Sequence, residues 1–326
     1  MIPQRRSKGD SATTSLAGRL ISCHADSGTK TLLRAFDLEH TTDQTSVELA
    51  LHLTLNEDAL GAAFDVTHTD YAHWRQGKQH AWTSQAPRHT ETLLISTPSR
   101  ARLFVDHETC RDATIAARPA TSSVSTWATH HEVFPLHASA VCRNGDGLLL
   151  VGEGGRGKTT TALALAMCGW NLIADDRCFV NVQDEALFMH SFYRTTIVTS
   201  LVANRFPELL GEHIGTTTEG KIASYLPTGI AVSKSARLRG LVLLNQQLDE
   251  PYQMTRLTAR EALAAWQQTL KLVRQPLGPD RTLFSLLTTA ARTVPAWQIN
   301  LGWDFQMLDK TLRRHLNALD ATSIAE

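Results

Sequence analysis

The pattern of apolar and polar residues divides the chain into two regions. From about residue 16 to 112, short segments alternate apolar and polar positions, as in 47–55 (VELALHLTL), 91–98 (ETLLISTP) and 101–107 (ARLFVDH). Such alternation is typical of strands that bury one face. The sequence therefore predicts a smaller, mostly β or α+β region at the amino-terminal end of the chain.

Beyond about residue 127, strands and helices are expected to alternate. Short apolar runs predict buried strands at 147–152, 171–174, 178–182, 241–245 and 294–302. Stop and capping signals predict helices at 158–169, from Thr258 to about 273, from about 280 to 292, and from Asp304 to about 319. This order of elements is typical of an α/β domain.

A segment of small and polar residues with one proline separates the two regions, at 113–126 (ATIAARPATSSVST). Because this composition is typical of a linker, we predict two domains. The first, 1–125, would serve substrate recognition or structure, and the second, 126–326, would be the α/β domain.

Composition narrows the classes of partner and compartment. Lys+Arg and Asp+Glu number 32 each, so no overall field favours nucleic acid or a membrane surface, and we expect neither as a partner. Five scattered cysteines form no CxxC pair, which indicates reduced thiols. The N-terminus lacks the apolar stretch of a signal peptide, and no run reaches the roughly 18 apolar residues of a membrane span. We therefore expect a cytoplasmic protein.

The strand predicted at 147–152 leads directly into the phosphate-loop pattern G-x-x-x-x-G-K-[ST]. Glycines let backbone N–H groups turn around phosphate oxygens, the lysine adds a positive charge, and the threonine hydroxyl can ligate Mg²⁺. The segment is therefore predicted to bind ATP, or another nucleoside triphosphate, together with Mg²⁺. The predicted binding residues are Gly152, Gly154, Gly155, Arg156, Gly157, Lys158, Thr159 and Thr160.

A pair of acids, Asp175 and Asp176, ends the strand predicted at 171–174. A phosphate loop needs a second acidic centre that holds the metal or accepts the proton of the phosphate acceptor. Taken alone, however, the pair is more typical of an ordinary acidic turn. The neighbouring motifs decide between these two interpretations.

Three segments in this order, 137–141 (HASAV), 152–166 (GEGGRGKTTTALALA) and 169–180 (GWNLIADDRCFV), closely resemble the catalytic half of the HPr kinase/phosphorylase family. The resemblance covers roughly residues 127–200 and continues weakly to the C-terminus. It implies a P-loop kinase domain of the HPr kinase or PEP carboxykinase-like type.

The resemblance also implies a role for each matching residue. Lys158 and Thr159 would bind phosphate and metal, and Asp176 would accept the proton of the substrate hydroxyl. Asp175 would support the metal or orient its neighbour. His137 would lie beside the phosphates in the catalytic cluster of the family.

One departure from the family points to a different acceptor. HPr kinases have a Glu-Ile-Arg-Gly signature downstream of the acidic pair, and its glutamate is a metal ligand, but the corresponding stretch, 190–206, contains no acid. HPr itself is therefore a poor candidate substrate, and the second metal ligand is open. The chain is similar to the wider group of HPr-kinase-like enzymes, which includes kinases of ribosomally made peptides such as a lasso peptide precursor. HPr kinases are hexameric, so a homo-oligomer is a candidate assembly.

The leading hypothesis is a kinase that transfers the γ-phosphate of ATP to a Ser or Thr hydroxyl of a peptide or protein, with Asp176 as the base. Because the transferring phosphoryl group needs cationic contacts, the candidates for these contacts are Arg194, Lys221 and Arg237 or Arg239. Two alternatives stay open, a kinase of a small hydroxyl metabolite and a nucleotide-binding regulatory module without transfer activity. The motifs describe the donor side of the reaction and do not separate these acceptors.

Overall fold

The structure is a computed structural model of the chain. It describes residues 10–39, 47–55, 71–76, 79–86, 89–95, 97–245, 252–270 and 281–323. Within these ranges, no helix combines the length and the apolar character that crossing a membrane would require.

The chain forms two compact units, and the first is built from three separate segments. It comprises Met1–His131, Tyr193–Thr195 and His213–Tyr225, and the second comprises Glu132–Phe192, Thr196–Glu212 and Leu226–Glu326. The chain thus first passes from one unit to the other at 131–132. Two later segments that the sequence interpretation assigned to the second domain belong to the first unit.

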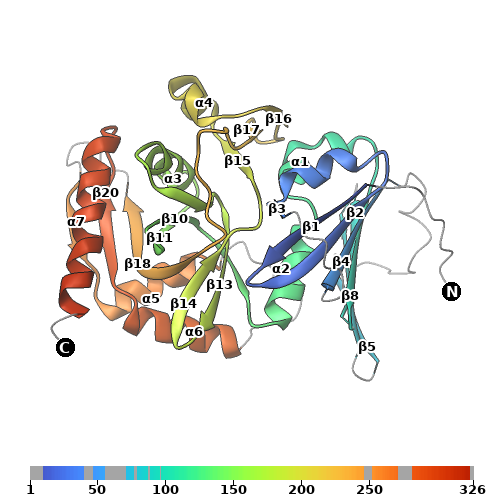
Figure 1. The fold of residues 1–326 in the computed structure, drawn as a ribbon, viewed down its shortest axis with the longest axis horizontal. Helices are drawn as coiled ribbons and strands as arrows, with labels where there is room; N and C mark the ends of the chain where they lie inside the picture. The colour runs from blue at the N-terminus through green and yellow to red at the C-terminus, as the bar shows by residue number, and fades with distance from the viewer. Residues whose placement is uncertain are drawn as a thin grey trace. The chain divides into compact units, whose positions relative to one another are not determined.

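The first unit contains an eight-stranded sheet of order β3-β1-β2-β4-β8-β7-β6-β5 (Figure 1). Its strands are β1 (Asp10–Leu16), β2 (Arg19–Ala25), β3 (Leu38–Glu39), β4 (Val47–Leu55), β5 (Tyr71–Gln76), β6 (Gln79–Ala86), β7 (His89–Ile95) and β8 (Ser99–Val105). The neighbours β2, β4 and β8 run parallel. Alternate residues of β4, Leu49, Leu51 and Leu53, are buried on one face, so the alternating pattern correctly predicted strands here.

The linker predicted at 113–126 is wrong, because this segment forms helices. They are α1 (Ala113–Ala117) and α2 (Thr121–His130), and short 3-10 turns lie at η1 (Lys30–Ala35) and η2 (Thr109–Arg111). The carboxylate of Asp112 caps α1 by accepting hydrogen bonds from the backbone N–H groups of Thr114 and Ile115. Val124 and Trp127 of α2 are fully buried. Burial of this apolar stripe overrides the weak helix propensity of the surrounding Ser and Thr residues.

The second unit is organised around a nine-stranded sheet in which β12, β10, β11, β18, β14, β13 and β9 follow one another. Strand β20 also pairs with β18, and β19 pairs with β20. The strands are β9 (Phe134–His137), β10 (Ser139–Arg143), β11 (Asp146–Val151), β12 (Asn171–Ala174), β13 (Arg177–Gln183), β14 (Ala186–His190), β18 (Ser235–Asn245), β19 (Met254–Arg256) and β20 (Ala296–Asn300). A separate small sheet has the order β15-β17-β16, with β15 (Thr195–Val198), β16 (His213–Thr216) and β17 (Ile222–Tyr225); of these strands, β16 and β17 belong to the first unit.

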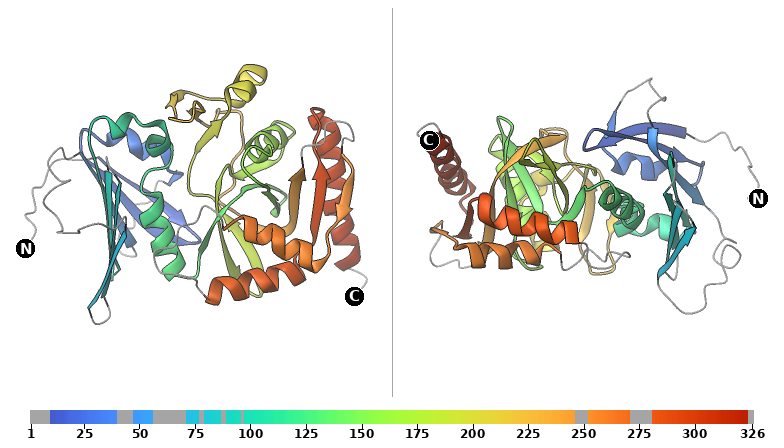
Figure 2. Two further views of the ribbon diagram at one scale, coloured as in Figure 1. Left: turned by 180° about the vertical axis from the view of Figure 1, so that it is seen from behind. Right: turned by 90° about the horizontal axis from the view of Figure 1, so that it is seen from below.

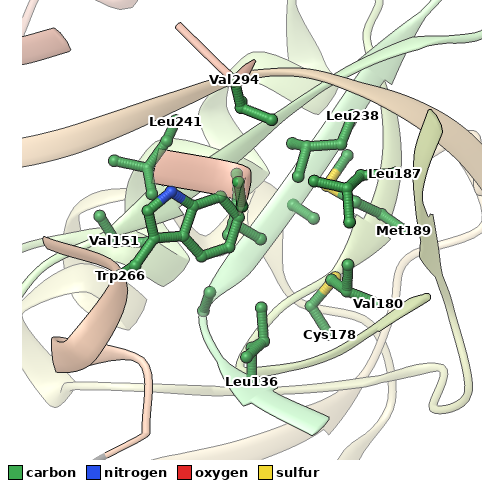
Figure 3. Packing of buried hydrophobic residues seen from close by; sticks show 14 of the residues in the cluster. Leu136, Val151, Cys178, Val180, Leu187, Met189, Leu238, Leu241, Trp266 and Val294 are labelled. Atoms are coloured by element: carbon green, nitrogen blue, oxygen red, sulfur yellow. The ribbon is translucent and has the colours of Figure 1, made fainter. Parts of the chain in front are cut away.

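Helices cover both faces of the nine-stranded sheet. The helical elements are α3 (Lys158–Met167), α4 (Ser200–Arg205), η3 (Pro207–Leu209), α5 (Ala259–Gln268), α6 (Arg281–Thr293) and α7 (Phe305–Ser323). Leu149 and Val151 of β11 lie in one apolar cluster with Trp266 of α5 and Leu287 of α6, and Figure 3 shows part of this packing. Helix α3 lies on the opposite face, where it also contacts α7 (Figures 1 and 2). The second unit is therefore a mixed α/β structure, as the sequence predicted.

The predicted strands and helices of the second region are confirmed, and the differences concern their ends. Helix α5 begins with the predicted capping box of Thr258 and Glu261, but it ends at Gln268. The remainder of that predicted helix lies outside the described residues from 271 onward. Asp304 caps α7, as predicted, by accepting a hydrogen bond from the backbone N–H of Met307 at 3.0 Å, and α7 continues to Ser323.

A buried polar contact ties the end of α3 to α7. Asp309 Oδ1 accepts hydrogen bonds from Trp170 Nε1 at 2.7 Å and from Arg313 Nε at 2.5 Å. Arg313 also donates to the carbonyl of Cys168, at 2.9 Å. This carbonyl follows the last turn of α3, where helical carbonyls lack partners within the helix. The contact therefore fixes the carboxyl end of α3, the helix that follows the glycine-rich segment 152–157.

Candidate active site

The glycine-rich loop connects the buried strand β11 to the first turn of α3. Gly155 and Gly157 have φ angles of 79° and 87°, which side chains disfavour, so the loop needs glycine at both positions. A Cβ atom added at Gly154 or Gly155 would meet no atom within 4 Å. The outer surface of the loop is therefore open to a ligand.

Lys158 places its charge inside this loop. The residue is only 7% exposed, and its Nζ donates hydrogen bonds to the carbonyls of Gly152, at 2.8 Å, and Glu153, at 3.2 Å. The next two residues, Thr159 and Thr160, are half-buried in the first turn of α3. An ammonium group beside the amino end of a helix favours an anion, so the donor set fits a phosphate group.

The strand order brings the acidic pair to the same edge of the sheet as the loop. Strands β11 and β12 both run antiparallel to β10, which lies between them, so they are parallel to each other. Their carboxyl ends are followed by Gly152 and Asp175. Two interstrand spacings separate these ends by about 10 Å. In open α/β sheets, this edge is where ligands bind.

His137 and Asp176 form a close pair at this edge. Nδ1 of the histidine lies 2.9 Å from Oδ1 of the aspartate, and the two side chains are 13% and 19% exposed. The backbone fixes both residues, because His137 N–H donates to the carbonyl of Thr269 at 2.8 Å and Ala138 N–H donates to the carbonyl of Asp176 at 3.1 Å. Arg177 Nε lies 3.8 Å from the second oxygen of Asp176. His137 and Asp176, which the sequence resemblance places in one catalytic cluster, are therefore in contact.

Asp175 points in a different direction from Asp176 and is only 5% exposed. Its Oδ2 accepts hydrogen bonds from Thr196 Oγ1 and from Ile197 N–H, both at 3.1 Å. The Ser139 hydroxyl donates to the backbone carbonyl of Asp175. These contacts anchor the end of β12 to β10 and β15. Sequence reasoning missed Thr196, which belongs to no motif and approaches Asp175 only through the fold.

Arg194 and Lys221 belong to the first unit, and each is paired with a carboxylate. Arg194 Nε lies 2.9 Å from Asp37 Oδ1, and Lys221 Nζ lies 2.6 Å from Glu219 Oε2.

The structure does not bring Arg237 or Arg239 to the loop. In the register of β11 and β18, Arg237 lies opposite Asp146, the first residue of β11. The loop follows the other end of β11, about 17 Å away at 3.3 Å per residue. Arg239 Nη1 lies 3.5 Å from Asp146 Oδ1, near this same distant end.

The side chains at this edge that could hold a metal ion are two carboxylates and one hydroxyl, those of Asp175, Asp176 and Thr159. The described part of the chain contains no cluster of three or more His, Cys, Asp or Glu side chains that could hold a metal, and all five cysteines are free. Mg²⁺ is commonly held by one or two carboxylates together with phosphate oxygens and water. A threonine hydroxyl after the glycine-rich loop and two aspartates at the end of β12 are the kinds of ligand that such a site uses.

Comparison with known proteins identifies no family. No family model and no curated protein matches the chain. Among solved structures, the HPr(Ser) kinase/phosphatase from Coxiella burnetii matches with a TM-score of 0.30 and 17% sequence identity, covering 57% of this chain and 98% of that chain. A match of this size defines neither the fold nor the reaction of the chain.

Proposed function

We propose that the protein is an ATP- and Mg²⁺-dependent kinase that phosphorylates a Ser or Thr hydroxyl of a peptide or protein. The observation that carries this function is the His137–Asp176 pair, whose two facing atoms lie 2.9 Å apart at the sheet edge that also holds the glycine-rich loop. Phosphoryl transfer needs a phosphate cradle and a positioned proton acceptor, and under this proposal the loop and Asp176 would supply the two.

The loop would hold the donor. Backbone N–H groups of 152–160 would bind phosphate oxygens, Lys158 would neutralise their charge, and the Thr159 hydroxyl would ligate the metal. When bound, Mg-ATP supplies the phosphoryl group and Mg²⁺ offsets its negative charge. Asp175 remains the candidate for a further metal contact. Its hydrogen bonds to Thr196 and Ile197 also suit it to positioning Asp176.

Asp176 would accept the proton of the acceptor hydroxyl. His137 would help to position this carboxylate, because its Nδ1 lies 2.9 Å from Oδ1 of Asp176. The proton of the acceptor would then go to Oδ2. An aspartate is sufficient for this step, because phosphoryl transfer depends on positioning and charge neutralisation more than on a strong base.

The proposed class of acceptor rests on the resemblance of the sequence to HPr-kinase-like enzymes. The stretch 190–206 lacks the acid of the HPr kinase signature. In its place, Thr196 and Ile197 donate hydrogen bonds to Asp175. This difference makes HPr an unlikely acceptor. We therefore place the acceptor among peptides or proteins with a free Ser or Thr hydroxyl, with ribosomally made precursor peptides as the first class to test.

The substitution Asp176→Asn tests this function, because it keeps the shape of the side chain and removes its basicity. We expect phosphate transfer to fall at least about 100-fold, the usual scale for a lost general base, while ATP affinity changes less than about threefold. Transfer from γ-labelled ATP to serine peptides and calorimetric titration with ATP measure the two effects. Asp184→Asn, at an exposed turn between β13 and β14, is the matched control and should leave both unchanged.

Two outcomes would contradict the proposal in different ways. Full transfer by the Asp176→Asn variant would exclude this residue as the base. Tight ATP binding by the wild type with no transfer to peptide or metabolite hydroxyls would favour a nucleotide-binding regulatory module instead.

A further inference from the structure

One face of the sheet in the first unit gathers positively charged and titratable side chains across three parallel strands. The registers pair His24 of β2 with His52 of β4, and His52 with Arg102 of β8. Their neighbours in sequence, including Cys23 and Leu51, are buried on the opposite face. Because side chains alternate between faces, the row of His24, His52 and Arg102 lies on the face away from this core.

Two further residues extend this row, and together the five define what we call the cationic face: Ser22, His24, His52, Arg100 and Arg102. Arg100 precedes Arg102 by two positions on β8, so both guanidinium groups lie on the same face. Across the described residues, neither guanidinium makes a hydrogen bond or an ion pair. The histidine rings stack with centroids 4.9 Å apart, and His24 Nε2 lies 3.2 Å from Ser22 Oγ.

The charges of the cationic face act on one another. Burial lowers the pKa of His24. Burial, followed by the positive charges of His24, Arg102 and Arg100, lowers the pKa of His52 to about 4. Burial is the larger cause of this shift and the neighbouring cations add to it, so the positive charge of the face is carried by its two arginines. An anionic ligand would offset this charge.

Carboxylates limit the length of this anionic ligand. Asp26 follows β2 and accepts a hydrogen bond from the backbone N–H of Leu55, at the end of β4. Asp106 follows β8 and accepts one from the backbone N–H of Thr109. At the other end of β4, Glu48 forms an ion pair with Arg19. A nucleic acid binds through many phosphates, so the carboxylates at both ends of these strands disfavour it more than they disfavour a short acidic peptide.

We propose that the cationic face binds a short acidic peptide segment, with the guanidinium groups of Arg100 and Arg102 pairing with its carboxylates. Arginine suits this role because its planar group forms two parallel hydrogen bonds with one carboxylate. We further assign this segment to the peptide acceptor, a step that rests on the proposed kinase function.

Binding of a fluorescein-labelled hexaglutamate peptide to the full chain, followed by fluorescence anisotropy at low salt and without nucleotide, tests the first step. We expect saturable binding that weakens at least about tenfold in the double variant Arg100→Ala/Arg102→Ala, as fits the loss of two charge-assisted pairs. Arg260→Ala, at an exposed position of α5, is the matched control and should bind like the wild type. Far-UV circular dichroism establishes that the variants are folded.

The outcomes separate the peptide from other ligands. Absence of saturable binding to the wild type, or equal binding by a folded double variant, would overturn the proposal. A labelled oligothymidylate of six nucleotides serves as the second probe. If it binds more tightly than hexaglutamate and loses affinity in the same variant, the face recognises nucleic acid and the peptide assignment is wrong.

The second step is tested by kinetics. The double variant should raise the KM of a serine peptide with an acidic extension at least about fivefold without changing kcat, and should not affect a neutral peptide. An equal KM for the acidic peptide in both proteins would overturn the assignment to the acceptor. Since the anisotropy experiment contains no ATP, its result is independent of whether Asp176 is the base.

Discussion

A buried histidine in the second unit makes stability depend on pH. His190 is 3% exposed, its Nε2 lies 2.8 Å from Asn181 Oδ1, and burial lowers its pKa to about 4. Below pH 6.5 the unfolded chain takes up a proton that folded His190 does not bind, so stability falls as the pH decreases toward 4. We expect a loss of about 2 kcal/mol between pH 7 and pH 5 from this residue.

Urea denaturation at both pH values measures this loss. Between pH 7 and pH 5, the unfolding free energy of the His190→Gln variant should fall by about 2 kcal/mol less than that of the wild type. The His213→Gln variant, changed at an exposed position of β16, should lose as much unfolding free energy as the wild type. His52 acts in the same direction, so the His190 variant keeps part of the effect. An unchanged difference between pH 7 and pH 5 in this variant would contradict the prediction.

At the level of single residues, the sequence predicts motif members better than their partners. Local signals in the sequence mark the motif members: a strand end and a glycine run mark Gly152, a helix start marks Lys158, and a strand end marks Asp176. Thr196 and Thr269 contact the acidic pair and His137 but belong to no pattern. Their contribution depends on which strands meet, and strand pairing is a long-range property that local periodicity does not contain.

Among the elements, α7 has a structural role that its sequence does not reveal. Replacing Asp309 by alanine would remove the acceptor of the buried Trp170 Nε1–H and of Arg313 Nε. An unsatisfied buried donor typically costs about 1–3 kcal/mol, and we expect the variant to lose about 2–3 kcal/mol of unfolding free energy. Lys310→Ala, exposed on the same helix, should change stability by less than about 0.5 kcal/mol.

Chemical denaturation of both variants gives these values. A loss of stability in the Asp309→Ala variant no larger than in its Lys310→Ala counterpart would show that the tie between α3 and α7 is dispensable.

The elements themselves were largely predictable from the sequence, because most combine a buried stripe with an end signal. The capping box at Thr258 correctly predicted the start of α5, and the glycine after α3 predicted the end of that helix to within two residues. The segment 113–126 was wrongly predicted as a linker because its Ser and Thr residues have weak helix propensity. Only the burial of Val124 and Trp127 explains why it is helical.

For the whole molecule, the proposed function predicts stabilisation that is confined to the second unit. A ligand at 100 times its Kd stabilises the state that binds it by about 2.7 kcal/mol. Mg-ATP should therefore raise the melting temperature. It should also slow hydrogen exchange in β11 and α3, while exchange in β2, β4 and β8 of the first unit stays unchanged.

Lys158→Met removes the charge inside the loop and should abolish both effects. Arg260→Ala provides a control with the same loss of one positive charge outside the loop. Slower exchange in the first unit alone would place the nucleotide elsewhere.

The interleaved path of the chain has a consequence for how the protein is made. The first unit includes His213–Tyr225, and α1 packs against the strands β16 and β17 of this late segment. On the ribosome, domains generally fold in order from the N-terminus. Here the first unit cannot be completed until residue 225 has been synthesised, after β9–β15 and α3 of the second unit. Folding of the first unit therefore ends only after much of the second unit has been synthesised, and a single truncation of the gene does not separate the two units.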